Sequence, residues 1–149
     1  MKKTFFAMLL SSGLILAQEI KVGTYLPFEY CKDQFDQSVI IDKKSKLLIV
    51  TFSKEKGIVM KNFLQKNKDF LRKKRATYMS DVSDVPTFVM AMFMKPKFKS
   101  YNYQIGLIED EKDALLMPKK EGLITVIHLR NKKIRKIEYK ENLDYLIKK

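Results

Sequence analysis

The stretch LLIVTFSKEKGIVMKNF, residues 47–63, changes from one hydrophobic pattern to another and decides the fold. Its opening residues are apolar without alternation, which predicts a strand over 46–52 that is covered on both faces. Ser53 can then cap a helix, and Glu55 places a negative charge in the first helical turn, where the helix dipole favours it. Reactive groups often lie where a buried strand ends and a helix begins, so the Ser-Lys-Glu-Lys turn is the first place to look for function.

The segments on either side extend this pattern into an α/β arrangement. Strands are predicted over 76–82 and 103–108, and a weak strand or irregular segment over 32–41. Between the first two, an apolar stripe at helical spacing predicts a buried helix that ends at Pro96, with the stripe made by Val85, Phe88, Val89, Met92 and Phe93. The chain closes with a hairpin and a short helix from Glu141. This order predicts an α/β sandwich with a mixed sheet flanked by helices.

The N-terminus has the pattern of an export signal. Two lysines precede an apolar stretch that ends at the small residue Ala17, which is typical of a secretory signal peptide over residues 1–17. A retained membrane anchor is the alternative, although the stretch is shorter than the ~20 residues that span a bilayer. We therefore expect a single domain over 18–149, periplasmic or secreted after cleavage near Ala17.

The chain is strongly basic, but its basic residues are mostly lysine. The formal net charge of +13 falls to +11 without Lys2 and Lys3, and only four of the thirty basic residues are arginine. Arginine is the residue that specific phosphate and nucleic-acid recognition usually recruits, so no specific nucleic-acid partner is expected. The dense cluster KNKDFLRKKR, residues 66–75, predicts at most a weak contact with an anionic membrane surface.

Two segments carry a resemblance to a known superfamily. KDQFDQSVIIDKKSKLLIVTFSKEKG, residues 32–57, resembles the opening of redoxin-type members of the thioredoxin superfamily, in which a DQ-containing hairpin precedes a buried strand and the active-site turn. ITVIHLRNKKIRKIEY with ENLDYLIKK, residues 124–149, resembles the closing ββα unit of that fold. The resemblance implies a thioredoxin-like sandwich.

The redox motif that the resemblance implies is missing. Redoxins that perform thiol chemistry place cysteine at the strand-to-helix turn, where this chain has Ser53, Lys54, Glu55 and Lys56. The cis-proline of the superfamily could correspond to Pro118. The chain is also similar to small exported bacterial proteins often described as FAD or FMN dehydrogenases, yet its five unclustered glycines provide no dinucleotide-binding turn.

The candidate site residues follow from these departures. Ser53, Lys54 and Lys56 at a helix N-terminus could hold a small anion. Cys31, the only cysteine, is either a small apolar residue or a possible reactive thiol. His128, the only histidine, has no partner in the sequence pattern that would make it a catalytic base for Ser53.

No metal or cofactor is predicted. Met90, Met92 and Met94 offer soft ligands, but helical spacing turns Met92 away from the other two, which favours methionine as core filler. The acidic run 109–113 lacks the spacing of a calcium loop. The favoured function is therefore an exported, redox-inactive thioredoxin-like module that binds a periplasmic protein or a ligand without catalysis. The alternative is an oxidoreductase that uses Cys31 or a flavin.

Overall fold

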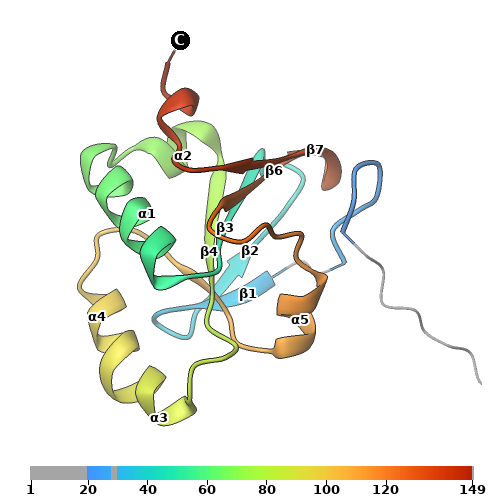
Figure 1. Cartoon of the computed structure of the whole chain (residues 1–149). Helices are drawn as coiled ribbons and strands as arrows, with labels where there is room; N and C mark the ends of the chain where they lie inside the picture. Colours follow the sequence, from blue (N-terminus) through green and yellow to red (C-terminus); the bar gives the residue numbers. More distant parts are fainter. Residues whose placement is uncertain (1–19, 28–29, 149) are drawn as a thin grey trace, which may run out of the picture.

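The structure is a computed structural model in which residues 20–27 and 30–148 are described. These residues form a 7-stranded mixed sheet with helices on both faces (Figure 1). The strand order is β2-β1-β5-β4-β3-β6-β7, with β1 (Tyr30–Asp33), β2 (Ser38–Ile40), β3 (Leu47–Thr51), β4 (Ala76–Asp81), β5 (Gly106–Ile108), β6 (Ile124–Arg130) and β7 (Lys133–Lys140). The predicted α/β sandwich with a mixed sheet is confirmed.

The centre of the sheet is the strand that the sequence pattern identified first. β3 pairs in parallel with β4 and antiparallel with β6, so Ile49 lies opposite both Tyr78 and Val126. All five residues of β3 are buried, as expected for a strand covered on both faces. The weak segment over 32–41 forms the β1–β2 hairpin, and β1 joins the sheet antiparallel to β5.

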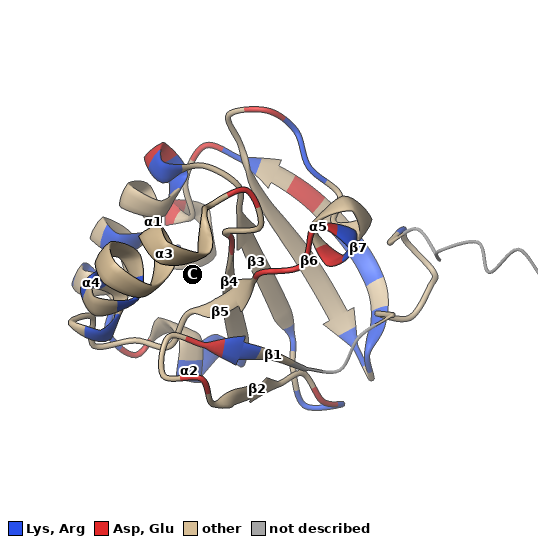
Figure 2. Cartoon of the chain, turned by 90° about the horizontal axis from the view of Figure 1, so that it is seen from below, with Lys and Arg blue, Asp and Glu red and all other residues tan. Residues whose placement is uncertain are grey.

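Helices on opposite faces of the sheet give the domain two apolar cores. Figure 2 shows α1 (Lys54–Lys66), α3 (Thr87–Val89) and α4 (Lys95–Lys99) on one side and α5 (Glu111–Leu116) on the other. The first core includes Met60, Phe63 and Leu64 of α1 and Phe70 of α2 (Phe70–Lys74). The second core includes Ala114 and Met117 at α5. Basic residues occur on many elements in Figure 2, in agreement with a solvated lysine-rich surface.

The predicted helix that ends at Pro96 is wrong in its C-terminal boundary. The helix runs from α3 through the π-helical turn η1 (Met90–Met94) into α4, so Pro96 lies inside it. Proline has no N–H and its ring clashes with the carbonyl four residues earlier, which here belongs to Met92. The π turn accommodates the proline within the helix. The N–H of Lys95 donates to the carbonyl of Met90, five residues earlier, and the helix continues.

The predicted burial of the apolar stripe on this helix is wrong for three of its five residues, whereas Val85 packs against the first core and Val89 is half-buried. Phe88, Met92 and Phe93 are 64%, 68% and 63% exposed, whereas Met90 is buried and Met94 packs against the first core. The helix thus turns the face of Met90 and Met94 to the sheet. Helical spacing alone could not say which of two apolar faces is covered, and the extra residue of the π turn shifts the faces further.

The C-terminal unit matches its prediction except for its helix. β6 and β7 form the expected hairpin, and positive φ angles at Asn131 and Lys132 give the two-residue turn that fits strand twist. The predicted helix from Glu141 is only the 3-10 turn η2 (Asp144–Leu146). A segment this short forms too few hydrogen bonds to offset helix nucleation, and buried Leu143 anchors it instead.

The predicted signal peptide, residues 1–17, lies outside the described residues. Within residues 20–27 and 30–148, no helix is long and apolar enough to cross a bilayer.

Candidate functional site

The turn between β3 and α1 holds Ser53 as the N-cap of the helix. Its backbone is extended (φ −144°, ψ 155°), and its Oγ accepts a hydrogen bond of 3.2 Å from the backbone N–H of Lys56. The carbonyl of Ser53 accepts from the N–H of Gly57 at 2.9 Å, which starts the regular helix. The serine hydroxyl therefore has a structural role as the cap of the helix.

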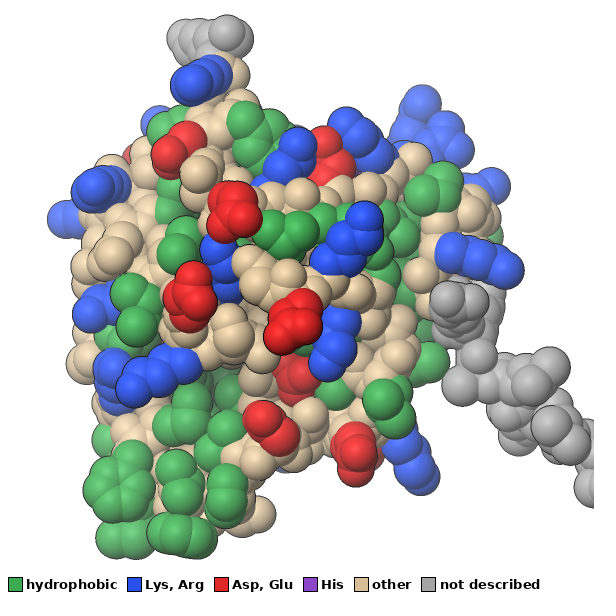
Figure 3. Space-filling view, in the orientation of Figure 1, with side chains coloured by type: hydrophobic (Ala, Val, Ile, Leu, Met, Phe, Trp, Pro, Cys, Tyr) green, Lys and Arg blue, Asp and Glu red, His purple; other side chains and the backbone are tan. Residues whose placement is uncertain are grey.

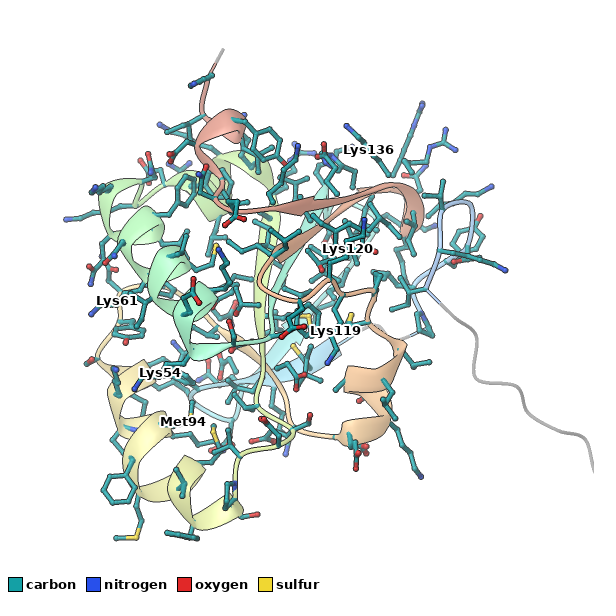
Figure 4. The ribbon with its side chains drawn as sticks, in the orientation of Figure 1. Lys54, Lys61, Met94, Lys119, Lys120 and Lys136 are labelled. Atoms are coloured by element: carbon teal, nitrogen blue, oxygen red, sulfur yellow. The ribbon has the colours of Figure 1, made fainter. Side chains whose placement is uncertain are left out.

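A cavity of about 570 Å³ opens beside this turn, between α1 and the helix formed by α3, η1 and α4. We call it the α1–α4 cleft. Figure 4 shows Lys54 and Lys61 on α1 along one side and Met94 of η1 on the other. In the space-filling view, apolar side chains gather below the lysines at the lower left, over α3 and η1 (Figure 3). The side chains that the sequence pattern assigned to a buried stripe thus belong partly to the cleft, which Val85, Val89 and Phe93 line.

Aromatic rings form much of the inner lining of the cleft. The rings of Tyr101 and Tyr103 stack with centroids 5.3 Å apart, and Tyr78 lies 6.3 Å from Tyr103. Burial raises the pKa of Tyr78 to about 12, and its hydroxyl shares a 2.9 Å hydrogen bond with Thr51 Oγ1. Tyr78 is therefore a neutral, fixed part of the lining with its polar atom already paired.

The Asp33-Gln34 pair of the β1–β2 hairpin holds the segment that carries Tyr101 and Tyr103 in place. Gln34 is fully buried; its Nε2 donates to the carbonyl of Tyr103 at 2.8 Å, and its Oε1 accepts from the N–H of Ile105 at 2.9 Å. Asp33 holds the hairpin turn by accepting from the N–H groups of Phe35 and Gln37. The motif that carried the superfamily resemblance has a structural role here: it positions one side of the cleft.

The rim of the α1–α4 cleft carries more basic than acidic side chains. Lys54, Lys61 and Lys97 line it, together with the carboxylates of Asp81 and Asp84. Asp81 already accepts two hydrogen bonds from Ser83, at 3.0 Å and 2.7 Å. Lys61 also lies over the Tyr101 ring, 5.6 Å from its centroid. Outside the rim, Lys119 lies 5.7 Å from the ring centroid of Phe52, which lines the cleft.

Of the three predicted anion-site residues, only Ser53 and Lys54 lie at the cleft. Lys56 is 4% exposed and turns away, with its Nζ 2.9 Å from Glu141 Oε2 and 3.3 Å from the Glu141 carbonyl oxygen. The sequence pattern missed Gly57, Lys61 and Lys97, which also line the cleft. A glycine inside an otherwise helical pattern was the one signal that could have drawn attention to this position.

Cys31 lies on the opposite face of the sheet from the cleft, where it packs against the second core. Burial, with the nearby charge of Asp33, raises the pKa of its thiol to about 11. A thiol with a raised pKa carries little thiolate near neutral pH and is a poor nucleophile. This environment favours the interpretation of Cys31 as a small apolar residue.

His128 has partners that the sequence pattern did not reveal. Its Nε2 lies 2.7 Å from Glu138 Oε2, which also accepts from the hydroxyl of Tyr145 at 2.9 Å. Burial opposes ionisation of Glu138, but hydrogen bonds from Lys136, His128 and Tyr145 lower its pKa to about 2. The cluster ties the edge strand β7 to the C-terminal segment, and none of its members lines the α1–α4 cleft.

The remaining predicted features have simple structural settings. All peptide bonds of the described residues are trans, so Pro118 is not the cis-proline that the resemblance allowed.

Met92 was assigned to the core by its spacing, but it is exposed, whereas Met90 fills the core. In the basic cluster 66–75, Asp69 pairs with Arg72 at 3.1 Å and Lys73 at 3.9 Å. Its contact with an anionic membrane surface stays a prediction.

Solved structures of several redox proteins share this arrangement. No protein-family model and no curated protein sequence matches the chain. A candidate protein disulfide isomerase from Bacteroides thetaiotaomicron aligns with a TM-score of 0.53 at 16% identity, over 85% of this chain and 84% of that one. The thioredoxin domain of a thiol-disulfide oxidoreductase from Bacteroides vulgatus aligns with a TM-score of 0.50 at 18% identity, over 80% of this chain and 89% of that one.

The chain has a thioredoxin-like fold. A peroxiredoxin-like protein from Aquifex aeolicus gives the same picture, with a TM-score of 0.50 at 13% identity over 85% of this chain and 80% of that one. Identities this low establish the fold alone. The similarity to flavin dehydrogenases stays a prediction.

Proposed function

We propose that this protein is an exported thioredoxin-like module that binds a ligand in the α1–α4 cleft and performs no thiol chemistry. One observation carries the proposal: a 570 Å³ cleft with mainly apolar lining opens beside a β3–α1 turn that holds Ser53 in place of a thiol. Clefts of this size with a few polar groups at the edge are the usual form of small-molecule sites.

The position of Cys31 supports the absence of disulfide exchange. Its thiol belongs to the core on the other face of the sheet, so a ligand in the cleft is separated from it by the sheet. With a pKa near 11, Cys31 has about 100-fold less thiolate at neutral pH than a cysteine at the ordinary value of 9.0.

A redox assay with one substitution tests the proposal. The purified protein is expected to give no insulin reduction with dithiothreitol above the reductant alone, no peroxide turnover and no flavin absorbance, and Cys31→Ser is expected to behave identically. Turnover that disappears in Cys31→Ser, or a bound flavin, would favour the oxidoreductase alternative and overturn the proposal. Export is tested separately by N-terminal sequencing of the protein from the periplasmic fraction, where a start at Gln18 is expected.

A further inference from the structure

Gly57 lies in the first half of α1, on the lining of the α1–α4 cleft. Glycine is a poor helix former, because an unfolded glycine has more conformations to lose. Neither backbone nor packing requires it here: a Cβ on Gly57 would meet no atom within 4 Å, and its φ is not positive. The residue that most destabilises a helix, short of proline, therefore stands where a side chain would project into open space of the cleft. The absence of a side chain at Gly57 leaves this part of the cleft open to a ligand.

The charged side chains at the rim indicate the charge of a ligand that binds in the cleft. Among the described residues, no carboxylate lies within ion-pair distance of Lys54, Lys61 or Lys97. Asp81 also lines the cleft as a carboxylate, and it is held by two hydrogen bonds from Ser83. Lys95, which shares α4 with Lys97, is by contrast paired with Asp36 and Glu109. The positive end of the α1 dipole adds to the field at Ser53 and Lys54. The three lysines of the cleft outnumber its two carboxylates, Asp81 and Asp84, and together with the helix dipole they complement an anionic group.

The interior indicates the body of the ligand. Behind the lysines lie the stacked rings of Tyr101 and Tyr103, with Phe98 6.0 Å from Tyr101. Because the hydroxyl of Tyr78 is paired with Thr51, Tyr78 contributes its ring to the lining of the cleft and offers no free hydrogen-bond donor. A lining of this kind binds flat apolar groups through offset or edge contacts.

From these three observations we infer that the ligand of the cleft is an amphiphilic anion, with an apolar ring-bearing body on the tyrosines and an acidic group at the lysines. The inference rests on the proposed function, since it names the ligand class of the same cleft. Gly57 is its specificity-determining position, because any larger residue there would occupy the space of the ligand.

Two fluorescent probes with the same ring system test the inference. 8-Anilino-1-naphthalenesulfonate carries one sulfonate, and N-phenyl-1-naphthylamine is its uncharged counterpart. We expect the anionic probe to bind the purified protein at least about tenfold more tightly than the neutral one. Gly57→Leu should weaken both probes by about tenfold or more, since the leucine fills the cleft, while thermal unfolding shows the variant to be folded.

Matched lysine variants separate the cleft from overall charge. The triple variant Lys54→Gln, Lys61→Gln, Lys97→Gln should bring the affinity of the anionic probe down to that of the neutral probe. The control triple Lys66→Gln, Lys68→Gln, Lys74→Gln removes the same charge from the α1–α2 end, and it should change the affinity by less than about twofold. Equal losses in both triples would show that net charge binds the probe and would overturn the inference.

The two failures are distinguishable. If both probes bind equally and Gly57→Leu blocks both, the cleft is a binding site but the anionic ligand class is wrong. If neither probe responds to Gly57→Leu, the cleft is not the binding site, and the proposed function fails with the inference.

Discussion

The ammonium of Lys56 lies 2.9 Å from the carboxylate of Glu141, a residue 85 positions later in the chain. The contact joins the first turn of α1 to the segment after β7. Because the stem of Lys56 is buried and its charge faces an exposed carboxylate, the residue acts as a packing element with a polar tip. One of the three residues predicted to bind an anion is thereby committed to the fold.

Substitutions at Lys56 should affect stability and leave the cleft unchanged. We expect Lys56→Ala to lower the free energy of unfolding by about 1–3 kcal/mol, because buried stem atoms and the contact to Glu141 are both lost. Lys56→Met keeps the volume and should cost less than about 1 kcal/mol. Urea unfolding measures both. The affinity of the anionic probe should not change in Lys56→Met; a large loss would place Lys56 in the ligand site after all.

Gly57→Ala should make the fold more stable. Alanine is favoured over glycine in a helix by about 0.5–1 kcal/mol, and no atom obstructs the new Cβ. Urea unfolding should show a gain of this size. Gly122→Ala is the opposing control, since Gly122 has φ +72° and alanine there is strained. A loss of stability in Gly57→Ala would mean that the fold requires this glycine and would remove the reason to connect it with a ligand.

The sequence predicted the central elements well because their patterns are locally determined. The unbroken apolar run of β3 and the cap at Ser53 depend on adjacent residues, and both are observed. The orientation of Phe88, Met92 and Phe93 depends on which helix face meets the sheet, and apolar spacing carries no such information. Gln34 shows the same limit: its role rests on contacts with residues about 70 positions away. The cleft, made by segments distant in sequence, was therefore beyond a local pattern.

Gly106 and Cys31 should show strong energetic coupling. A Cβ at Gly106 would lie 2.5 Å from Cys31 Sγ and 3.0 Å from Met79 Cγ. Gly106→Ala should therefore destabilise the protein by about 1–3 kcal/mol through overpacking. Cys31→Ala removes the closer atom, so the double variant should recover a part of this loss, a coupling of about 0.5–2 kcal/mol in a double-mutant cycle. Additive effects would contradict the packing role assigned to the thiol.

Glu138 should make stability depend on acid pH. Its pKa is 4.5 ordinarily and about 2 in the folded protein. Since the folded value is lower, ionised Glu138 stabilises the fold above about pH 4.5, and this contribution is lost as the pH falls from 4.5 towards 2. We expect Glu138→Gln to cost about 1–3 kcal/mol near neutral pH and progressively less below pH 4.5. Glu121→Gln, at an exposed loop position, is the control. A constant difference between wild type and Glu138→Gln across this range would contradict the lowered pKa.

Gln34 connects the stability of the fold to the shape of the cleft. Gln34→Leu leaves the buried N–H of Ile105 and the carbonyl of Tyr103 without their partner, which should cost about 2–3 kcal/mol in urea unfolding. The loss also frees the segment that carries Tyr101 and Tyr103, so the anionic probe should bind more weakly under conditions where the variant is fully folded. Gln104→Leu, which removes the exposed donor to Asp33, should cost about 1 kcal/mol and leave probe binding unchanged. Full probe affinity in folded Gln34→Leu would show that the ligand does not contact the tyrosine side of the cleft.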